Sequence, residues 1–475
     1  MVKEIIKSFS KASIIYGLGG ALRKLSGFLL LPFLTEKLTP KDYGVFALIS
    51  LIMIAFTGIA NLGTGNSVSI LFFQENNIKK QENLIWTNSI LLFFTNILLL
   101  IFVIIFSENI SQLVLKTDLY SNIIIISFLG LSLRVLSDPF MNYLRMTKQS
   151  LKYVLINAFG TVIFVLLTIY HVIYLDQGLA GYVLAITLSH LFSFIFILLI
   201  VGFRISFDLT VAKIMPLIKI GFPSIFGVFA FLVIDYSDRE LIQLFLGLDS
   251  LGIYTVAYSF GMLVVLFTDA FSLAWSPFFN SYINKQSEAK FIFPSILNVY
   301  LALSFSILIL IFYCSKSIFH LFTESSYHSG YSIIGLISFS YLMKGVYLIF
   351  LPGFYFNKKL HLISLIEWSS AIINVILNLI MIPKLGIIGA AIATALSYLT
   401  LCIISYFKGN KYLEVNYQWI NISKTTVITF TAIILIQMIN EVQLSYQYFE
   451  YFMGGFIAVI SIYFIFQINK KHIIQ

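Results

Sequence analysis

Long runs of apolar residues recur along the whole chain and are separated by short polar stretches. A helix of about 20 apolar residues is long enough to cross the hydrocarbon core of a bilayer. The pattern predicts fourteen membrane spans, near residues 12–34, 43–71, 84–106, 120–141, 152–174, 179–202, 214–236, 251–280, 292–313, 329–353, 361–382, 386–407, 422–440 and 447–467. Because the connections between them are short, we expect an all-α polytopic membrane protein without a separate soluble domain.

One pattern of apolar and small residues occurs twice, about 208 residues apart. Residues 178–191 read GLAGYVLAITLSHL and residues 386–399 read GIIGAAIATALSYL, with identity at six of fourteen positions. The same offset places Gly44 on Gly252, and each of these glycines opens a long apolar run. Since six predicted spans separate equivalent positions, both copies start on the same side of the membrane. The repeat is therefore predicted to be parallel, with its axis along the membrane normal.

This duplication divides the chain into two lobes and a tail. We expect a six-helix lobe over residues 1–205, a second six-helix lobe over residues 206–410 and two trailing helices over residues 411–475. Parallel repeats of this kind are typical of transporters in which two lobes rock about a shared central site.

Composition agrees with the membrane assignment, since 59% of the residues are hydrophobic and only 11% are charged. The formal net charge is +9, and most of the positive charge is explained by the placement of Lys and Arg in loops on one side of the membrane. Of the 30 Lys and Arg residues, 20 fall in loops on the side of the N-terminus, six on the opposite side and four inside spans. By the positive-inside rule, both termini are predicted to be cytoplasmic. Little reason then remains to expect nucleic acid as a partner.

The sequence contains no arrangement typical of an enzyme or of a metal site. Its six His residues do not cluster at ligand spacing, its two Cys residues have no metal-binding spacing, and it has no glycine-rich phosphate loop. We therefore expect no catalytic residues, no bound metal and no cofactor, apart from H+ or Na+ that could be coupled to transport.

Four cations lie inside predicted spans: Arg23, Lys24, Arg134 and Lys344. A charge at the bilayer centre costs roughly 2.5–3.5 kcal/mol, so it is retained where it faces a cavity or a partner. With an offset of 210 residues, Arg134 falls on Lys344, so both lobes would present a cation at matching depth. These residues predict an electropositive cavity that suits an anionic group such as pyrophosphate.

A second interpretation of these cations is structural. Arg134 lies one helical turn before Asp138, and the two charges could neutralise each other. Arg23 or Lys24 could instead extend to the membrane interface.

The acidic residues in spans raise a separate question, which is ion coupling. Asp138, Asp269 and Glu367 are candidates, because a carboxylate inside the membrane can take up and release H+ or Na+. Trp368, next to Glu367, is also compatible with a position near the interface.

Two segments resemble the polysaccharide transport proteins, the Wzx-type O-antigen and oligosaccharide flippases. Residues 23–44 read RKLSGFLLLPFLTEKLTPKDYG, with Pro32, Pro40 and the Tyr-Gly pair in the pattern of that family. The second half carries Asp238-Arg239, followed by Leu248, Gly252 and Tyr254. The similarity covers essentially the whole chain.

The resemblance implies a MATE-like fold of two six-helix bundles and two further helices. It implies translocation of an undecaprenyl-pyrophosphate-linked oligosaccharide across the bacterial cytoplasmic membrane, for O-antigen, capsule or another surface polysaccharide. Partners would be this lipid-linked oligosaccharide, membrane lipid, a polysaccharide polymerase and a chain-length regulator. A cationic inner cavity is also implied, with Arg23, Lys24, Arg134 and Lys344 as its candidates here. None of the acidic residues matches a coupling motif of the family.

Three other functions remain open from the sequence. A drug or cation antiporter of the same superfamily would be expected to have an acidic pocket and few buried cations. A polysaccharide polymerase or ligase would need a large external loop, whereas the external loops predicted here are short. A lipid II flippase would recognise the same pyrophosphate and is separated only weakly from the leading hypothesis.

Overall fold

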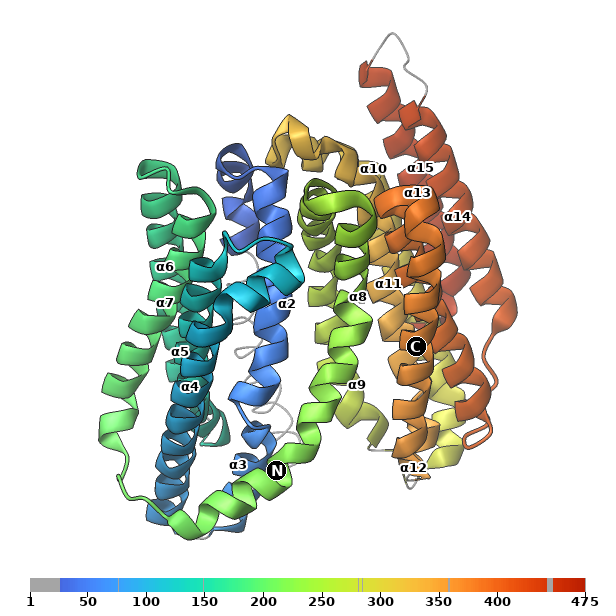
Figure 1. Cartoon of the computed structure of the whole chain (residues 1–475). Helices are drawn as coiled ribbons and strands as arrows, with labels where there is room; N and C mark the ends of the chain where they lie inside the picture. Colours follow the sequence, from blue (N-terminus) through green and yellow to red (C-terminus); the bar gives the residue numbers. More distant parts are fainter. Residues whose placement is uncertain are drawn as a thin grey trace. The chain divides into compact units, whose positions relative to one another are not determined.

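The computed structural model describes residues 26–75, 77–147, 149–280, 282–283, 285–357, 359–441 and 447–474. Within these ranges the chain is helical and contains no strand (Figure 1). The prediction of an all-α protein is confirmed.

Packing separates the chain into two compact units. The first consists of Met1–Gln243 and Gly247–Gly252, and the second of Leu244–Leu246 and Ile253–Gln475. The repeat boundary at residues 205 and 206 remains a prediction from the sequence.

The first unit includes seven helices or parts of helices within the described residues. They are α2 (Pro40–Ala60), α3 (Thr64–Gln74), α4 (Ile78–Leu115), α5 (Ser121–Met146), α6 (Ser150–Thr168), α7 (Gly178–Ile200) and most of α8 (Ile214–Gly261). Helix α5 packs against both α4 and α7, and α7 packs against α6, so these four run side by side (Figure 1).

The second unit contains the remaining helices. They are α9 (Val265–Asn280), α10 (Gln286–Phe322), α11 (Tyr331–Ile349), α12 (Pro352–Phe356), α13 (Leu360–Asn410), α14 (Trp419–Glu441) and α15 (Gln447–Ile474). Helix α11 packs against α10 and α13, while α14 and α15 pack against each other and against α10. The trailing pair is thus joined to this unit through α10.

In the described part of the chain, eleven helices are long and apolar enough to cross a membrane. The longest of these, His361–Asn410, contains two of the predicted spans, because the backbone of α13 breaks at Gly386. The helices are consistent with fourteen spans, and that number remains a prediction.

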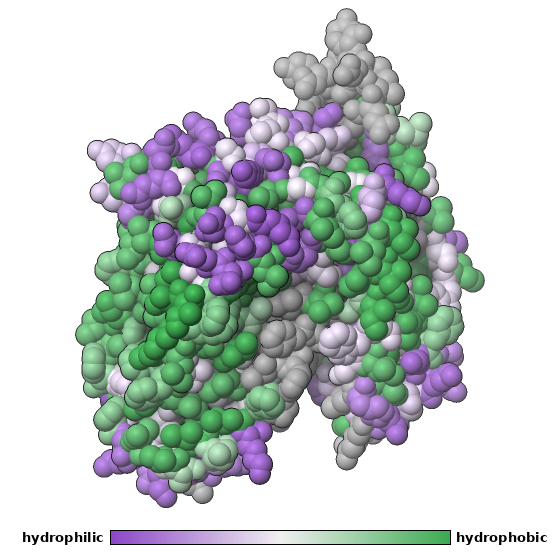
Figure 2. Space-filling view, viewed as in Figure 1, coloured by the Kyte–Doolittle hydropathy of each residue, from purple (hydrophilic) through white to green (hydrophobic). Residues whose placement is uncertain are grey.

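Apolar side chains on the flanks of these helices face outward. On α4, for example, Leu98 is 69% exposed and Ile105 is 64% exposed. So many exposed apolar side chains are not found on proteins that are surrounded by water. Figure 2 shows hydrophobic side chains covering the long flanks, with hydrophilic side chains gathered toward the ends. The protein is therefore a multi-pass membrane protein whose flanks contact lipid.

One predicted span, 43–71, is interrupted in the structure. Helix α2 ends at Ala60, and the backbone at Leu62 and Gly63 is left-handed, with φ values of 49° and 64°. The side chain of Asn61 accepts a hydrogen bond from the N–H of Gly63 at 2.8 Å and stabilises this turn. A continuous apolar pattern did not reveal the break, because it depends on a local side chain–backbone bond.

The sequence repeat has a counterpart in the backbone. Gly178 begins α7 with φ of 55°, and Gly386, its equivalent 208 residues later, breaks α13 with φ of 62°. An L-residue in this left-handed region costs roughly 1–2 kcal/mol, so glycine is favoured at both positions. Both copies of the pattern thus start a helix from a glycine with positive φ.

The glycines Gly44 and Gly252 explain why two helices of the first unit approach closely. A Cβ atom added to Gly44 would overlap the carbonyl oxygen of Leu248, and one added to Gly252 would overlap the carbonyl oxygen of Pro40. The offset of 208 residues relates Pro40 to Leu248 as well as Gly44 to Gly252, so the contact is reciprocal. Helices α2 and α8 therefore cross backbone to backbone at duplicated positions.

The connection from α7 to α8 is bound to the start of α4. The N–H of Ser206 donates to Glu82 Oε2 at 2.9 Å, and the N–H of Thr210 donates to Thr87 Oγ1 at 3.0 Å. Lys213 Nζ donates to Glu75 Oε1 at 2.5 Å, and this bond lowers the pKa of Glu75 below its usual range. The connection is thus an ordered part of the first unit.

Candidate functional site

Arg134 lies in the middle of α5 and borders a cavity of about 220 Å³. The cavity is enclosed by α2, α5 and α7, all of which belong to the first unit. The side chain of Arg134 is exposed although its helix is a membrane span. Because an exposed guanidinium facing lipid would be costly, the cavity supplies the polar surroundings that Arg134 requires.

His190 on α7 lines the same cavity as Arg134, together with Ser50 on α2 and Ser127 on α5. A guanidinium and an imidazole can both donate hydrogen bonds, and hydroxyl groups can donate as well. This set of donors, inside an otherwise apolar lining, is suited to an anionic oxygen.

The close packing of α5 and α7 shapes this cavity. Thr187 Oγ1 donates a hydrogen bond to the carbonyl oxygen of Ile126 at 2.9 Å. A Cβ atom at Gly130 would lie 2.7 Å from the same hydroxyl. Gly130 therefore allows the two helices to approach until this bond forms, one turn before Arg134.

Asp138 lies one turn after Arg134 on α5 but lines a different, larger cavity of about 550 Å³. This cavity is bordered by α3, α4 and α5 and is rich in polar side chains, among them Asn61, Asn88 and Asn142. Arg134 and Asp138 thus border separate cavities. The neutralisation of the two charges that their spacing indicated remains a prediction from the sequence.

Lys344 on α11 lies near Glu367 on α13, within the second unit. Tyr347 Oη donates a hydrogen bond to Glu367 Oε1 at 2.9 Å. Lys344 and Glu367 are both half-buried. Separate roles were predicted for these two residues, and the structure places them on helices α11 and α13, which pack against each other.

The remaining candidates have different outcomes. Asp269 lies on α9 and is exposed. Arg23 and Lys24 lie outside the described residues. Arg134 and Lys344 belong to different compact units, so their presentation at matching depth stays a prediction from the sequence.

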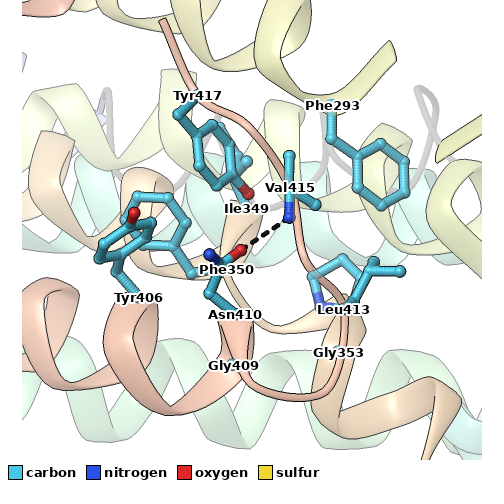
Figure 3. A pocket seen from close by; sticks show the side chains of 11 residues that line it. Phe293, Ile349, Phe350, Gly353, Tyr406, Gly409, Asn410, Leu413, Val415 and Tyr417 are labelled. Atoms are coloured by element: carbon cyan, nitrogen blue, oxygen red, sulfur yellow. Dashed lines mark hydrogen bonds between the residues drawn. The ribbon is translucent and has the colours of Figure 1, made fainter. Parts of the chain in front are cut away.

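A further pocket in the second unit is too small for a substrate. It lies among Phe293, Phe350, Tyr406 and Tyr417, and its volume is about 10 Å³ (Figure 3). That is close to the space that one water molecule needs. The Oδ1 atom of Asn410 accepts a hydrogen bond from the N–H of Val415 at 2.7 Å, which fixes the turn after α13.

Across the described ranges, no three His, Cys, Asp or Glu residues are grouped as metal ligands would be. The polar cavity-lining side chains that were not singled out from the sequence include two amides and one imidazole, namely Asn88, Asn142 and His190. A search for uncharged polar residues inside apolar runs would have found the two amides. His190 is 56 residues from Arg134, so only the packing of α5 on α7 reveals that pair.

Comparison with protein families gives one match. Residues 9–283, more than half of the 475-residue chain, match the family described as "Polysaccharide biosynthesis protein". Among curated protein sequences no match is found.

Several solved membrane transporters have a similar structure. The lipid II flippase MurJ, in an inward closed conformation, is similar with a TM-score of 0.77 and 14% sequence identity, covering 98% of this chain and 99% of MurJ. An inward-facing multidrug resistance MATE family transporter of the MOP superfamily gives 0.66 and 13% identity, covering 82% of this chain and 94% of that one. A MOP superfamily transporter from Pyrococcus furiosus, described as having a binding pocket of reverse polarity, gives 0.63 and 16% identity, covering 86% and 96%.

At these identities the structural similarity establishes the fold. The MATE-like architecture expected from the resemblance is confirmed. In the match to MurJ, almost the whole of each chain takes part.

Proposed function

The chain belongs to the polysaccharide biosynthesis protein family, and on that basis we propose that it is a flippase for lipid-linked oligosaccharides. Its substrate is an oligosaccharide repeat unit on undecaprenyl pyrophosphate, destined for O-antigen, capsule or a related surface polysaccharide. Alternating access exposes the binding site to each side of the cytoplasmic membrane in turn, while the lipid tail stays in the bilayer. The MATE-like fold supports this mechanism, since its two repeats are the elements that rock.

The observation that carries the proposal is the surroundings of Arg134. An exposed guanidinium in a membrane span, beside His190 and a cavity of about 220 Å³, requires an anionic partner or water. Pyrophosphate supplies several anionic oxygens, and a guanidinium binds these in bidentate fashion. Lys344 in the second repeat, with Arg23 and Lys24, completes the proposed cationic site.

Transport against a gradient needs an energy source, and the proposed source is H+ or Na+. Asp138, Asp269 and Glu367 are the carboxylates proposed for coupling. Glu367 is held by Tyr347 and lies near Lys344, so ion binding there would change the balance of charge beside a proposed substrate cation.

The proposed orientation places both termini in the cytoplasm, following the distribution of Lys and Arg. The bacterial cytoplasmic membrane is the proposed location. A polysaccharide polymerase and a chain-length regulator are the proposed partners on the product side. The chain itself is proposed to carry out no catalysis.

A lipid II flippase is the second candidate, and the extent of the match to MurJ favours it. Both functions use the same carrier pyrophosphate, so the cations named above serve either one. The sugars attached to the carrier are what distinguish the two candidates.

Deletion of the gene tests the proposal in the cell. We expect surface polysaccharide to be lost, with complete repeat units accumulating on lipid carriers at the cytoplasmic face. Leaflet-resolved analysis of these lipids measures the accumulation and identifies the sugar. Loss of cell-wall synthesis with accumulated lipid II would select the second candidate. Unchanged surface glycan with altered drug or cation sensitivity would instead place the chain among the antiporters.

A further inference from the structure

The cavity of about 550 Å³ in the first unit has a composition that pyrophosphate recognition does not explain. Its polar lining includes Asn61, Ser69, Asn88, Asp138, Asn142 and Arg145, with Phe73 also contributing to the wall. Amides, a carboxylate, a hydroxyl and a guanidinium together provide both donors and acceptors of hydrogen bonds. A site for anionic oxygens alone would not need the Asp138 carboxylate.

We propose that this cavity binds the sugar portion of the lipid-linked substrate. The inference rests on the proposed flippase function and adds a second recognition site, separate from the cations that bind the pyrophosphate. Sugar hydroxyl groups donate and accept hydrogen bonds at once, which matches the mixed lining of the cavity.

Asn88 is the strongest sign of a ligand. Asn88 belongs to the lining of the cavity and is 1% exposed, and its buried Oδ1 atom has no hydrogen-bond partner in the described structure. A buried acceptor without a partner costs about 1–3 kcal/mol. A sugar hydroxyl that donates to this oxygen would remove that cost.

The residues around Asn88 are arranged to support the same ligand. Arg145 donates a hydrogen bond from Nη2 to Asn142 Oδ1, and this bond orients the Asn142 amide. Asn61 Oδ1 is likewise occupied by the N–H of Gly63 at 2.8 Å. Phe73 is 68% exposed on α3 and offers an aromatic face on which the apolar side of a sugar ring can pack.

The cavity, at about 550 Å³, is much larger than a single ion requires. Sites for small molecules measure about 300–1,000 Å³. The cavity lies within that range, and one or two sugar rings would fill it better than a hydrated cation.

The position of the cavity agrees with the direction of transport. Phe73 lies at the end of α3 and Arg145 at the end of α5. The next helices begin with Lys79 and Lys80 on α4 and Lys152 on α6, and the positive-inside rule places these helix ends in the cytoplasm. The cavity is thus located toward the side on which the proposed substrate is received.

Binding to two lipids tests the inference with the purified full-length protein. The probes are lipid-linked oligosaccharides extracted from the bacterium that carries this chain, and undecaprenyl pyrophosphate without sugar. We expect Phe73→Ala and Asn88→Leu each to weaken binding of the sugar-bearing lipid about tenfold, the loss expected from one or two hydrogen bonds or an aromatic contact. The affinity for the sugar-free lipid should stay within about twofold of wild type.

Matched substitutions outside the cavity control for effects on folding. Phe94→Ala removes an exposed phenylalanine from the flank of α4, and Asn157→Leu removes an amide from α6. Both should bind the two lipids as wild type does. Because Phe73 is exposed, its alanine variant should fold even if Asn88→Leu does not.

The outcomes separate this inference from the proposed function. If the cavity variants weaken the binding of both lipids equally, or change the binding of neither, the sugar site is wrong and the flippase function is unaffected. Equal affinity of the wild type for the two lipids would do the same. A wild-type protein that binds neither lipid would refute the flippase function, and the sugar site with it.

Discussion

Arg134→Ala and Lys344→Ala are each expected to abolish surface polysaccharide while leaving the amount of protein in the membrane near the wild-type level. The physical reason is that each substitution removes a cation proposed to bind the carrier pyrophosphate, and a charge-assisted hydrogen bond contributes about 1.5–3 kcal/mol. Transport by the purified protein should fall about 10- to 100-fold. Export is measured from surface glycan, and protein abundance from isolated membranes.

Conservative and distant variants make this result specific. Arg134→Lys keeps the charge but loses the bidentate geometry, so it should retain partial activity. Arg204→Ala removes an exposed cation from the connection after α7 and should export normally. If Arg134→Ala and Lys344→Ala also export normally, these charges have a structural role. Arg134 and Lys344 would then serve to balance the negative charges of Asp138 and Glu367.

Gly252→Val is expected to have the largest effect on folding. Any Cβ atom at this position overlaps the carbonyl group of Pro40, and it also lies 3.0 Å from the backbone nitrogen of Gly44. Because both obstacles are backbone atoms, no side-chain rotation can relieve the overlap. Helices α2 and α8 must separate, and overpacking of this kind costs at least about 1–3 kcal/mol. We expect a lower thermal unfolding temperature in detergent and severalfold less protein in the membrane.

The reciprocal contact provides a second test of the same crossing. Gly44→Val should resemble Gly252→Val, and the double variant should be less destabilised than the sum of the two, since one separation of the helices relieves both overlaps. Gly27→Val is the matched control, because within the described residues no neighbouring part of the chain comes within 4 Å of a Cβ at Gly27. A Gly252→Val protein with wild-type unfolding temperature and export would show that the close crossing is not required.

Much of the fold could be predicted from hydrophobic pattern alone. Apolar runs of membrane length fixed the positions of most helices, and the 208-residue repeat identified Gly178 and Gly386, which share a left-handed backbone. The interruption at Leu62 and Gly63 was not predicted, because it depends on a hydrogen bond that the N–H of Gly63 donates to the Asn61 side chain, and not on a polar segment. Periodicity records which residues avoid water and contains little information about such local bonds.

The site could be predicted less completely than the fold. Charges inside spans are conspicuous, so Arg134, Asp138, Lys344 and Glu367 were all found from the sequence. The other residues that line their cavities were not found. His190, for example, lines the cavity of Arg134 only because α7 packs against α5. The amides of the sugar cavity carry no charge and were overlooked for that reason.

Reconstitution of the purified protein in liposomes is the measurement that tests the central claim most directly. Extracted lipid-linked oligosaccharide is placed in one leaflet, and the sugar that becomes accessible to an added glycosidase or lectin on the other side is followed over time. The account predicts protein-dependent translocation that Arg134→Ala slows about 10- to 100-fold and Arg204→Ala preserves. Sugar that stays in its original leaflet with the wild-type protein present, under an imposed H+ or Na+ gradient, would contradict the assignment of this chain as a flippase.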